Sequence, residues 1–263
     1  MSGLADTFEH LRKARRGGLV AYLTAGDPDA DRSAAVLTAV ARAGADVLEI
    51  GVPFSDPLAD GPVIQRASER ALAQGMTLRH AIALVRRVRS AVPTPIVLFT
   101  YANPILRMGV RAFASEAADA GADGVLILDL PLEEAEGSCR MLIEACLDPV
   151  VLVSPTTTDD RIRRAASLGR GFLYVISRLG VTGMRDRLPD DITDLVGRVR
   201  ARTDLPVALG FGISHPDHVA AVCRTADAAV VGSALVNVVA EHAASPDLCE
   251  RAGEYVRWLK SGL

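Results

Sequence analysis

Two acidic residues occur where a short apolar segment gives way to a proline-containing loop. Residues 48–62 read LEIGVPFSDPLADGP, so Glu49 interrupts the apolar segment and Asp60 lies near the end of the loop. Burying an ionised carboxylate without a partner is unfavourable, so a strand keeps one when it has a partner, a raised pKa or a chemical task. We interpret the pair as a candidate general acid–base site.

The two carboxylates are expected to differ in their ionisation. Alternation along a strand would point Glu49 into the mouth of a barrel, and the loop would return Asp60 to the same mouth. Apolar surroundings would raise the pKa of Glu49 so that it exchanges protons near neutral pH, whereas a more solvated Asp60 would stay ionised. The alternative is a structural Glu49 that accepts hydrogen bonds from backbone N–H groups.

Two further acids compete for these roles. Asp27 lies in the segment TAGDPD, where we expect it to cap or fix a turn before Pro28. Asp129 ends another apolar segment, and we expect it to support neighbouring loops, including the loop at 53–60, rather than to act in catalysis.

Glycine-containing segments at 180–183 (GVTG), 210–214 (GFGIS) and 231–234 (VGSA) predict a phosphate site. Each follows an apolar segment, and glycine lets backbone N–H groups approach a dianion closely. A short helix that begins at Ser233 would add the positive end of its dipole. The alternative is that these glycines only end strands in tight turns.

The residues that are scarce restrict the chemistry. Cleavage of a carbon–carbon bond in a sugar phosphate needs a lysine Schiff base, a metal ion or the substrate itself to accept electrons. Lysine occurs only at 13 and 260, and the one close pair of histidines, in HPDH at 215–218, fits a helix start. The four cysteines have no CxxC spacing, so we expect neither a zinc site nor a disulfide framework.

Eight apolar, β-branched segments alternate with segments of helical periodicity. We expect strands at about 19–24, 46–52, 95–101, 123–129, 149–153, 171–176, 206–210 and 227–231. Strands that are apolar on both faces indicate a parallel sheet covered by helices. The pattern predicts an α/β fold, a (β/α)₈ TIM barrel forming one domain over residues 1–263, with extra helices at about 3–15 and 246–260. An open doubly wound sheet is the alternative.

The barrel prediction places the candidate chemistry at one end of the molecule. The two longest irregular segments, 53–62 and 177–190, both follow strands, and loops after strands build the active sites of this fold. The formal charge of −3 and the lack of a basic block favour neither nucleic acid nor an anionic membrane as a partner. With no apolar run of about 18 residues, we expect a cytoplasmic protein.

The segment LEIGVPFSDPLADGPVIQRA, together with TAGDPD, YANP, SRLGVTG and GFGIS, closely resembles the tryptophan synthase α subunit family. The resemblance runs in order from about residue 4 to 259. It implies a (β/α)₈ barrel that cleaves indole-3-glycerol phosphate to indole and glyceraldehyde 3-phosphate. It also implies an α₂β₂ assembly in which pyridoxal phosphate belongs to the β subunit and no cofactor belongs to this chain.

The resemblance implies a role for each matching residue. Glu49 would protonate C3 of the indole ring and assist removal of the glycerol hydroxyl proton, and the resulting indolenine would accept the electrons. Asp60 would stabilise positive charge at the indole nitrogen, Thr182 would position Asp60 when 177–190 closes, and Tyr174 would lie near Glu49. The implied apolar walls of the indole pocket are Tyr22, Phe99, Leu126, Leu152 and Phe211. The implied phosphate site is Gly183, Gly212, Gly232 and Ser233, and the implied partner contacts are Asp56, Pro57, Asn103 and Pro131.

Two departures from the family pattern and three other functions remain open. The segment before the eighth strand reads TAD instead of the usual AGA, and Leu179 replaces a small residue after Arg178. The first affects the register of the phosphate site, and the second affects loop closure or signalling to a partner. The alternatives are a non-catalytic barrel subunit that activates a partner, a stand-alone indole-3-glycerol-phosphate lyase, and a sugar-phosphate isomerase or epimerase.

Overall fold

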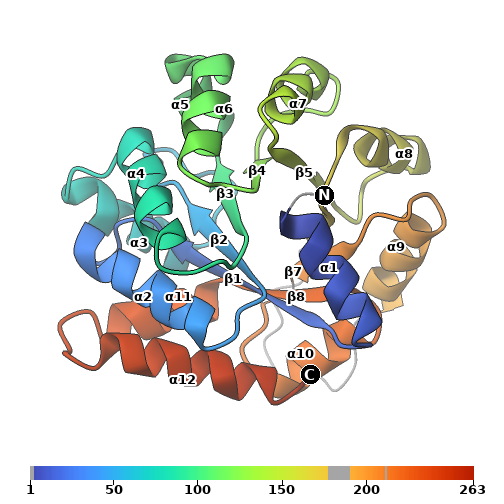
Figure 1. Ribbon diagram of the computed structural model, residues 1–263. Helices are drawn as coiled ribbons and strands as arrows, with labels where there is room; N and C mark the ends of the chain where they lie inside the picture. The colour runs from blue at the N-terminus through green and yellow to red at the C-terminus, as the bar shows by residue number, and fades with distance from the viewer. Residues whose placement is uncertain (1–2, 177–189, 211) are drawn as a thin grey trace.

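Eight parallel strands close into a barrel in the computed structural model, which describes residues 3–176, 190–210 and 212–263 (Figure 1). Each strand pairs with the next in the chain, and β1 pairs with β8. The strands are β1 (Gly18–Thr24), β2 (Val47–Gly51), β3 (Ile96–Thr100), β4 (Gly124–Ile127), β5 (Asp148–Val153), β6 (Leu173–Ile176), β7 (Val207–Gly210) and β8 (Ala228–Val231). The (β/α)₈ prediction is confirmed, and the open doubly wound sheet is wrong.

Helices surround the barrel, as the periodicity predicts (Figure 1). They are α1 (Gly3–Lys13), α2 (Ala30–Arg42), α3 (Pro62–Ala73), α4 (Leu78–Arg89), α5 (Ala102–Met108), α6 (Val110–Asp119), α7 (Ala135–Glu144), α8 (Asp159–Leu168), α9 (Asp190–Arg200), α10 (Pro216–Cys223), α11 (Ser233–Glu241) and α12 (Leu248–Lys260). Helix starts follow the sequence signals: Thr77 caps α4, and His215 caps α10 by accepting from the backbone N–H of Asp217.

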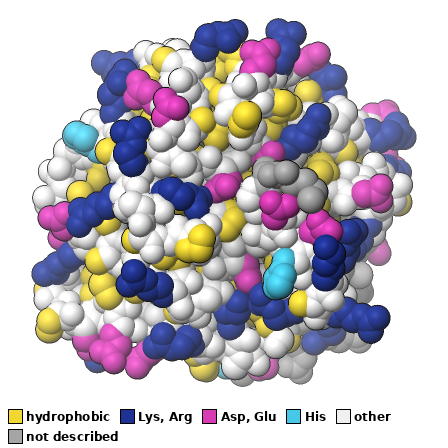
Figure 2. Space-filling model, viewed as in Figure 1, with side chains coloured by type: hydrophobic (Ala, Val, Ile, Leu, Met, Phe, Trp, Pro, Cys, Tyr) yellow, Lys and Arg dark blue, Asp and Glu magenta, His cyan; other side chains and the backbone are white. Residues whose placement is uncertain are grey.

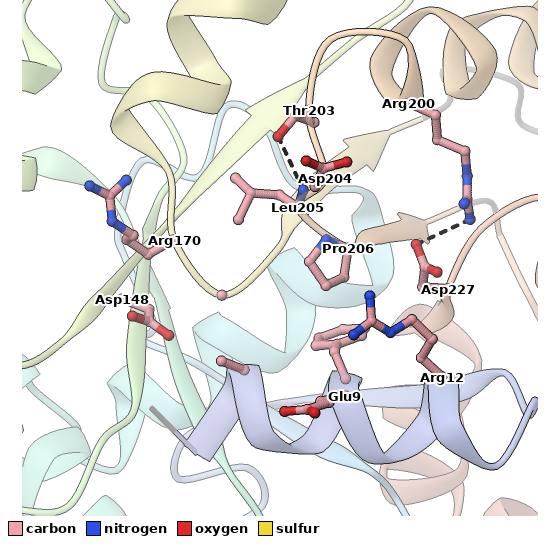
Figure 3. Close-up of a pocket in the computed structure, with 13 residues that line it drawn as sticks. Glu9, Arg12, Asp148, Arg170, Arg200, Thr203, Asp204, Leu205, Pro206 and Asp227 are labelled. Carbon is pink, nitrogen blue, oxygen red and sulfur yellow. Dashed lines mark hydrogen bonds and ion pairs between the residues drawn. The ribbon is translucent and has the colours of Figure 1, made fainter. Parts of the chain in front are cut away.

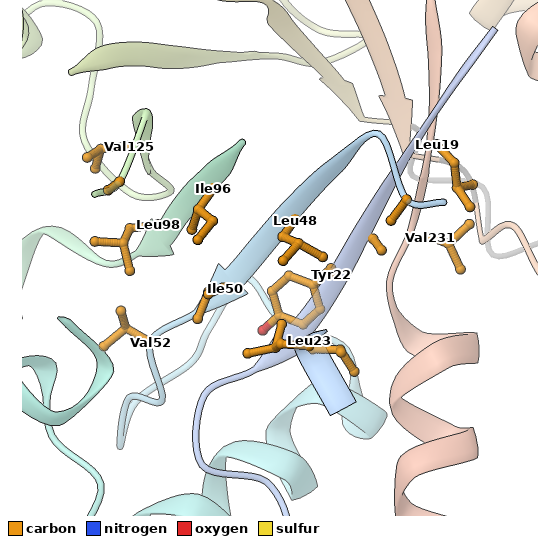
Figure 4. Packing of buried hydrophobic residues seen from close by; sticks show 14 of the residues in the cluster. Leu19, Tyr22, Leu23, Leu48, Ile50, Val52, Ile96, Leu98, Val125 and Val231 are labelled. Atoms are coloured by element: carbon orange, nitrogen blue, oxygen red, sulfur yellow. The ribbon is translucent and has the colours of Figure 1, made fainter. Parts of the chain in front are cut away.

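Alternation along each strand separates two apolar layers. Leu19, Leu48, Ile50 and Leu98 face outward and pack under the helices (Figure 4). The inward positions form a second cluster that fills the lumen, comprising Val20, Val47, Val97, Leu126, Val150, Tyr174, Ala208 and Val230. Since Glu49 is two residues after Val47, it occupies an inward position of β2.

Helix α1 closes the N-terminal end of the barrel. Its apolar side chains Leu4, Phe8 and Leu11 are buried and join the cluster inside the lumen. The ring of Phe8 lies 5.4 Å from that of Phe172, which enters β6. Because apolar side chains fill this end, the space beside Glu49 can open only toward the C-terminal ends of the strands.

Three aspartates, each in the turn before a strand, hold the N-terminal ends of neighbouring strands together. Asp46, Asp123 and Asp227 directly precede β2, β4 and β8, and each accepts a hydrogen bond from the backbone of the neighbouring odd-numbered strand. Each also pairs with a cation. The backbone donors are Leu19, Ile96 and Val207, and the cations are Arg16 with Lys260, Arg89, and Arg200.

The outer surface mixes charges of both signs. On the face that carries α1, Lys and Arg side chains lie among Asp and Glu side chains (Figure 2). Among the helices of residues 3–176, 190–210 and 212–263, none combines the length and apolarity that crossing a membrane requires.

Candidate active site

Glu49 is a buried carboxyl group inside the barrel. It lies between Tyr22 of β1 and Val97 of β3 in the strand register, and its exposed fraction is 1%. Within the described residues its Oε1 has no hydrogen-bond partner. Burial raises its pKa from 4.5 to about 8. The pKa of Glu49 is raised as the sequence predicts, so Glu49 is protonated at neutral pH and has a proton to donate; its catalytic role stays a prediction.

Asp60 approaches the same region from the loop after β2. Its Oδ2 accepts a hydrogen bond from the hydroxyl of Tyr101 at 3.0 Å, and that hydroxyl also accepts from the backbone of Ala59 at 3.2 Å. Burial raises the pKa of Asp60 to about 6, although the Tyr101 bond opposes the rise. Asp60 is still mainly ionised at pH 7, but it is less solvated than the sequence analysis assumed. Tyr101 was not predicted as a site residue; its only signal was the YANP segment.

Two buried tyrosines lie within the electrostatic range of both carboxylates. Burial raises the pKa of Tyr22 well above its ordinary value, and the charges of both Asp60 and Glu49 add to the rise. Burial raises the pKa of Tyr174 in the same way, with Glu49 as the leading charge. Because both acids act on both rings, the two carboxylates and the two tyrosines share one space. The prediction that Tyr174 lies near Glu49 agrees with this electrostatic contact.

Glycines at the C-terminal ends of two strands give these rings room. A Cβ on Gly51 would lie 2.1 Å from the hydroxyl oxygen of Tyr22, and a Cβ on Gly210 would lie 3.0 Å from that of Tyr174. Neither glycine was predicted to have this role. The sequence signal that could have indicated them is a glycine as the last residue of an otherwise apolar strand, as in VLEIG and VALG.

Apolar side chains line the lumen beside the acids. The ring of Phe99 meets that of Tyr22 edge-on at 5.3 Å, and Phe99 pairs in register with Leu126, which is fully buried. Leu152 pairs in register with Tyr174 on the next strand and is partly exposed. These surroundings fit a flat apolar ring. The remaining expected wall residue, Phe211, lies outside the described residues.

The described part of the predicted phosphate site lies at the C-terminal ends of β7 and β8. Gly212 adopts φ +63, which favours glycine, and Gly232 precedes α11 without a side-chain cap. The first N–H groups of α11, starting at Ser233, have no intrahelical acceptor and lie at the positive end of the helix dipole. Carbons of Tyr22 lie 3.7 Å from the position of a Cβ on Gly232, so this end of α11 adjoins the acid site. Thr182 and Gly183 lie outside the described residues.

Sequence comparison identifies the family. A family model described as "Tryptophan synthase alpha chain" matches residues 8–260. The tryptophan synthase alpha chain of Solibacter usitatus is 45% identical over 262 residues, covering 100% of this chain and 98% of the relative. That of Thioalkalivibrio sulfidiphilus is 47% identical over 252 residues, covering 95% of both. The chain belongs to the tryptophan synthase alpha chain family.

Solved structures agree with this membership. The alpha subunit of tryptophan synthase from Legionella pneumophila is 36% identical and has a TM-score of 0.92, covering 100% of this chain and 98% of the other. A chain in the structure of tryptophan synthase from Mycobacterium tuberculosis is 38% identical with a TM-score of 0.91, covering 99% and 98%. The family resemblance and the TIM barrel are therefore confirmed.

Asp27 and Asp129 have other partners than the sequence indicates. Asp27 was expected to cap or fix a turn, and Asp129 was expected to support neighbouring loops. Asp27 is buried and forms a paired hydrogen bond with the guanidinium of Arg70 on α3, at 2.8 and 2.7 Å, while Asp29 caps α2. The cap or turn-fixing role was predicted from the position of Asp27 before Pro28. The partner Arg70 is 43 residues away, and no local pattern indicates the pair. Asp129 accepts a hydrogen bond from the backbone of Ala102 at 2.7 Å and none from the described loop at 53–60.

The residues that match partner contacts of the family lie on the surface. Asp56, Asn103 and Pro131 are exposed, and Pro57 is half-buried. Beside them Leu58 is 95% exposed, and it was not predicted. An apolar side chain that protrudes between Pro57 and Ala59 adds to the case for a protein contact here. Within the described residues, no group of three or more His, Cys, Asp or Glu side chains has the arrangement of a metal site.

Proposed function

We propose that the chain is the α subunit of tryptophan synthase and cleaves indole-3-glycerol phosphate to indole and D-glyceraldehyde 3-phosphate. The observation that carries the proposal is the buried Glu49, whose Oε1 has no hydrogen-bond partner among the described residues and whose pKa of about 8 leaves it protonated while Asp60 is ionised. Few structural roles require such a pair in an apolar lumen. Family membership supports the same reaction.

The proposed reaction is a retro-aldol cleavage in which one carboxyl group acts twice. Glu49 first donates its proton to C3 of the indole ring, and the resulting indolenine carries positive charge at nitrogen. The ionised Asp60 stabilises that charge. The Glu49 carboxylate then takes the proton of the glycerol hydroxyl next to the ring, the carbon–carbon bond breaks, and its electrons return to the ring. Indole and the aldehyde leave, and Glu49 is protonated again.

The surrounding residues position the substrate. Tyr22, Phe99, Leu126, Leu152 and Phe211 enclose the indole ring, and Gly183, Gly212, Gly232 and Ser233 hold the phosphate, so the reacting bond is presented to Glu49. Tyr174 adjoins Glu49 and the glycerol portion. Thr182 orients Asp60 when the segment 177–190 closes. These roles rest on the match to the family and on the position of the described members around Glu49.

We further propose that the chain carries no cofactor and works with a β subunit in an α₂β₂ assembly. Neither lysine is placed to form a Schiff base in the lumen, since Lys13 pairs with Glu9 on α1 and Lys260 with Asp46 at the N-terminal end. Pyridoxal phosphate belongs to the β partner in this proposal. Asp56, Pro57, Asn103 and Pro131 contact that partner, the whole chain 1–263 acts as one domain, and the enzyme is cytoplasmic.

Indole release from indole-3-glycerol phosphate tests the proposal. We expect slow release by the purified chain and strong stimulation when the β subunit is added, because contacts around Asp56 favour closure over the substrate. Inactivity with and without the partner would instead identify a non-catalytic activating subunit. Full activity without stimulation would identify a stand-alone lyase, and turnover of a pentose phosphate without indole release would identify an isomerase or epimerase.

A further inference from the structure

The pairing of β4 with β5 ends before β5 itself ends, near the C-terminal end of the barrel. Their pairing ends at Leu126 and Val150, whereas β5 continues to Val153 and keeps its pairing with β6. Beyond Leu126 and Val150 the register pairs no further residues of these two strands, which leaves an opening between their C-terminal ends.

A cavity of about 220 Å³ occupies this opening. Residues of both faces of the wall line it: Leu128, Val150 and Leu152 occupy inward positions, whereas Val125, Ala135 and Cys139 belong to the outer layer beneath α7. A pocket confined to either layer would be lined by one face of the strands only. The cavity therefore passes from the lumen into the space between the strands and α7.

The lumen end of this cavity coincides with the expected indole pocket. Leu152 is both an expected wall of that pocket and a lining residue of the cavity. Leu128 and Leu152 are partly exposed. Leu126, two residues before Leu128 on the same side of the chain, is fully buried. Both partly exposed leucines border this cavity.

We propose that the cavity is a side pocket of the substrate site that accepts an apolar substituent on the benzene part of the indole ring. The chain would thus cleave ring-alkylated or ring-halogenated indole-3-glycerol phosphates, a specificity that depends on the proposed function. The inner lining is aliphatic apart from the buried thiol of Cys139, so it offers a hydroxyl or amino substituent no strong partner. Three polar residues also line the cavity, Ser154, Thr157 and Arg161, and Arg161 is held by Glu133.

A size series on the substrate tests the proposal without altering the protein. Methyl and ethyl groups are placed in turn on each of the four free carbons of the benzene ring, and kcat/KM for indole release is compared with that of the parent. One position is expected to stay within about fourfold of the parent, since a buried methyl group is favourable by about that factor. The other positions are expected to lose roughly 10- to 200-fold, as crowding in an apolar pocket does. A hydroxymethyl group at the tolerated position is expected to fall below ethyl.

Filling the cavity provides the matched test. Ala135→Leu adds bulk from α7, at a residue that does not touch the reacting groups, and Ala118→Leu on α6 adds the same bulk in a groove outside the barrel. Ala135→Leu is expected to leave the parent substrate within about twofold and to lower the tolerated analogue roughly 10- to 200-fold. Ala118→Leu is expected to change neither. If Ala135→Leu does not fold, the smaller Cys139→Val replaces it, with folding checked by thermal unfolding.

Three results would overturn the side pocket. They are equal losses at all four ring positions, a tolerated position that a folded filling variant leaves unchanged, and equal effects of the filling and control variants. Cleavage of the parent substrate separates the two proposals. If the parent is cleaved while no substituent is tolerated, the side pocket alone is wrong; if the β-supplemented chain does not cleave the parent, the proposed function fails as well.

Discussion

Carboxyl groups at the two ends of the barrel differ in whether they are paired. At the N-terminal end, Asp46, Asp123 and Asp227 each accept a backbone hydrogen bond and pair with a cation. At the C-terminal end, Glu49 is more deeply buried than these three aspartates, and its Oε1 has no partner in the described part of the chain. A partly buried carboxylate that is paired holds elements together, whereas a buried carboxyl group without a charged partner retains its proton and is available to react.

Several of the charged residues that line a cavity at the N-terminal end are also paired. A cavity of about 700 Å³ lies between α1 and the segments that lead into β6, β7 and β8 (Figure 3). It is lined by charged residues, but Arg200 pairs with Asp227 at 3.1 Å, and Glu9 pairs with Lys13 at 2.7 Å. Size therefore does not locate the chemistry, and an unsatisfied acid in an apolar lumen is the better guide.

The largest expected effect follows from removing the unpaired acid. Glu49→Gln is expected to bind the substrate yet lose indole release by more than about 10⁴-fold, beyond the usual contribution of one general acid or base, because Glu49 acts in two steps. Single-turnover measurements at saturating substrate check this. Near-normal turnover by the folded variant would reject the role.

Asp60→Asn is expected to cause the next largest loss. The amide keeps the shape of the side chain but cannot stabilise positive charge at the indole nitrogen, so kcat falls by about 10²- to 10³-fold while some activity remains. Indole release with the β subunit present measures it. A loss that appears only in KM would mean that Asp60 binds substrate without stabilising charge.

The opposed ionisation of the two acids predicts a bell-shaped pH dependence of kcat/KM. Activity requires ionised Asp60 and protonated Glu49, so the limbs are expected near the pKa values of about 6 and about 8.

Tyr101→Phe removes a hydrogen bond that lowers the pKa of Asp60, so the acidic limb is expected to move up by as much as about one pH unit. An acidic limb that stays in place would reject the role of Tyr101.

The smallest expected effect on turnover is at the paired end. Asp123→Asn weakens the pairing with Arg89, so the free energy of unfolding is expected to fall by about 1–3 kcal/mol while kcat stays within about twofold. Urea unfolding and indole release on the same sample measure both. If this variant lost activity as severely as Glu49→Gln, the division between the two ends would be wrong.

Local patterns predicted what depends on neighbours in the sequence. All eight strands lie within two residues of their expected bounds at each end, because apolar β-branched segments mark them. Glu49 was predicted for the same reason, since a charge inside such a segment breaks the pattern. The pairing of Asp27 with Arg70 and the hydrogen bond from Tyr101 to Asp60 were not predicted, because they join residues 43 and 41 positions apart.

Other features needed the closed barrel. The opening between β4 and β5 results from unequal strand lengths, four residues against six, and no local composition marks it. The space that Gly51 leaves for Tyr22 likewise exists only once β1 and β2 are paired. Thr182, Gly183 and Phe211, which the family match assigns to the site, stay predictions because they lie outside the described residues.

The pH dependence of stability adds an independent check on Glu49. Its folded pKa of about 8 lies above the ordinary 4.5, so folding favours the protonated form. This contribution to stability is fully present below pH 4.5 and is lost as the pH rises toward about 8. The wild type is therefore expected to lose stability across this range relative to Glu49→Gln, and parallel curves would contradict the burial.

A direct titration of the Glu49 carboxyl group is the most decisive measurement. Carbon-13 NMR of protein labelled at the glutamate carboxyl carbons, compared between wild type and Glu49→Gln, identifies its signal. We predict a midpoint near pH 8 in the substrate-free protein. A midpoint near the ordinary value of 4.5 would mean that Glu49 is ionised at neutral pH and has no proton to give to the indole ring.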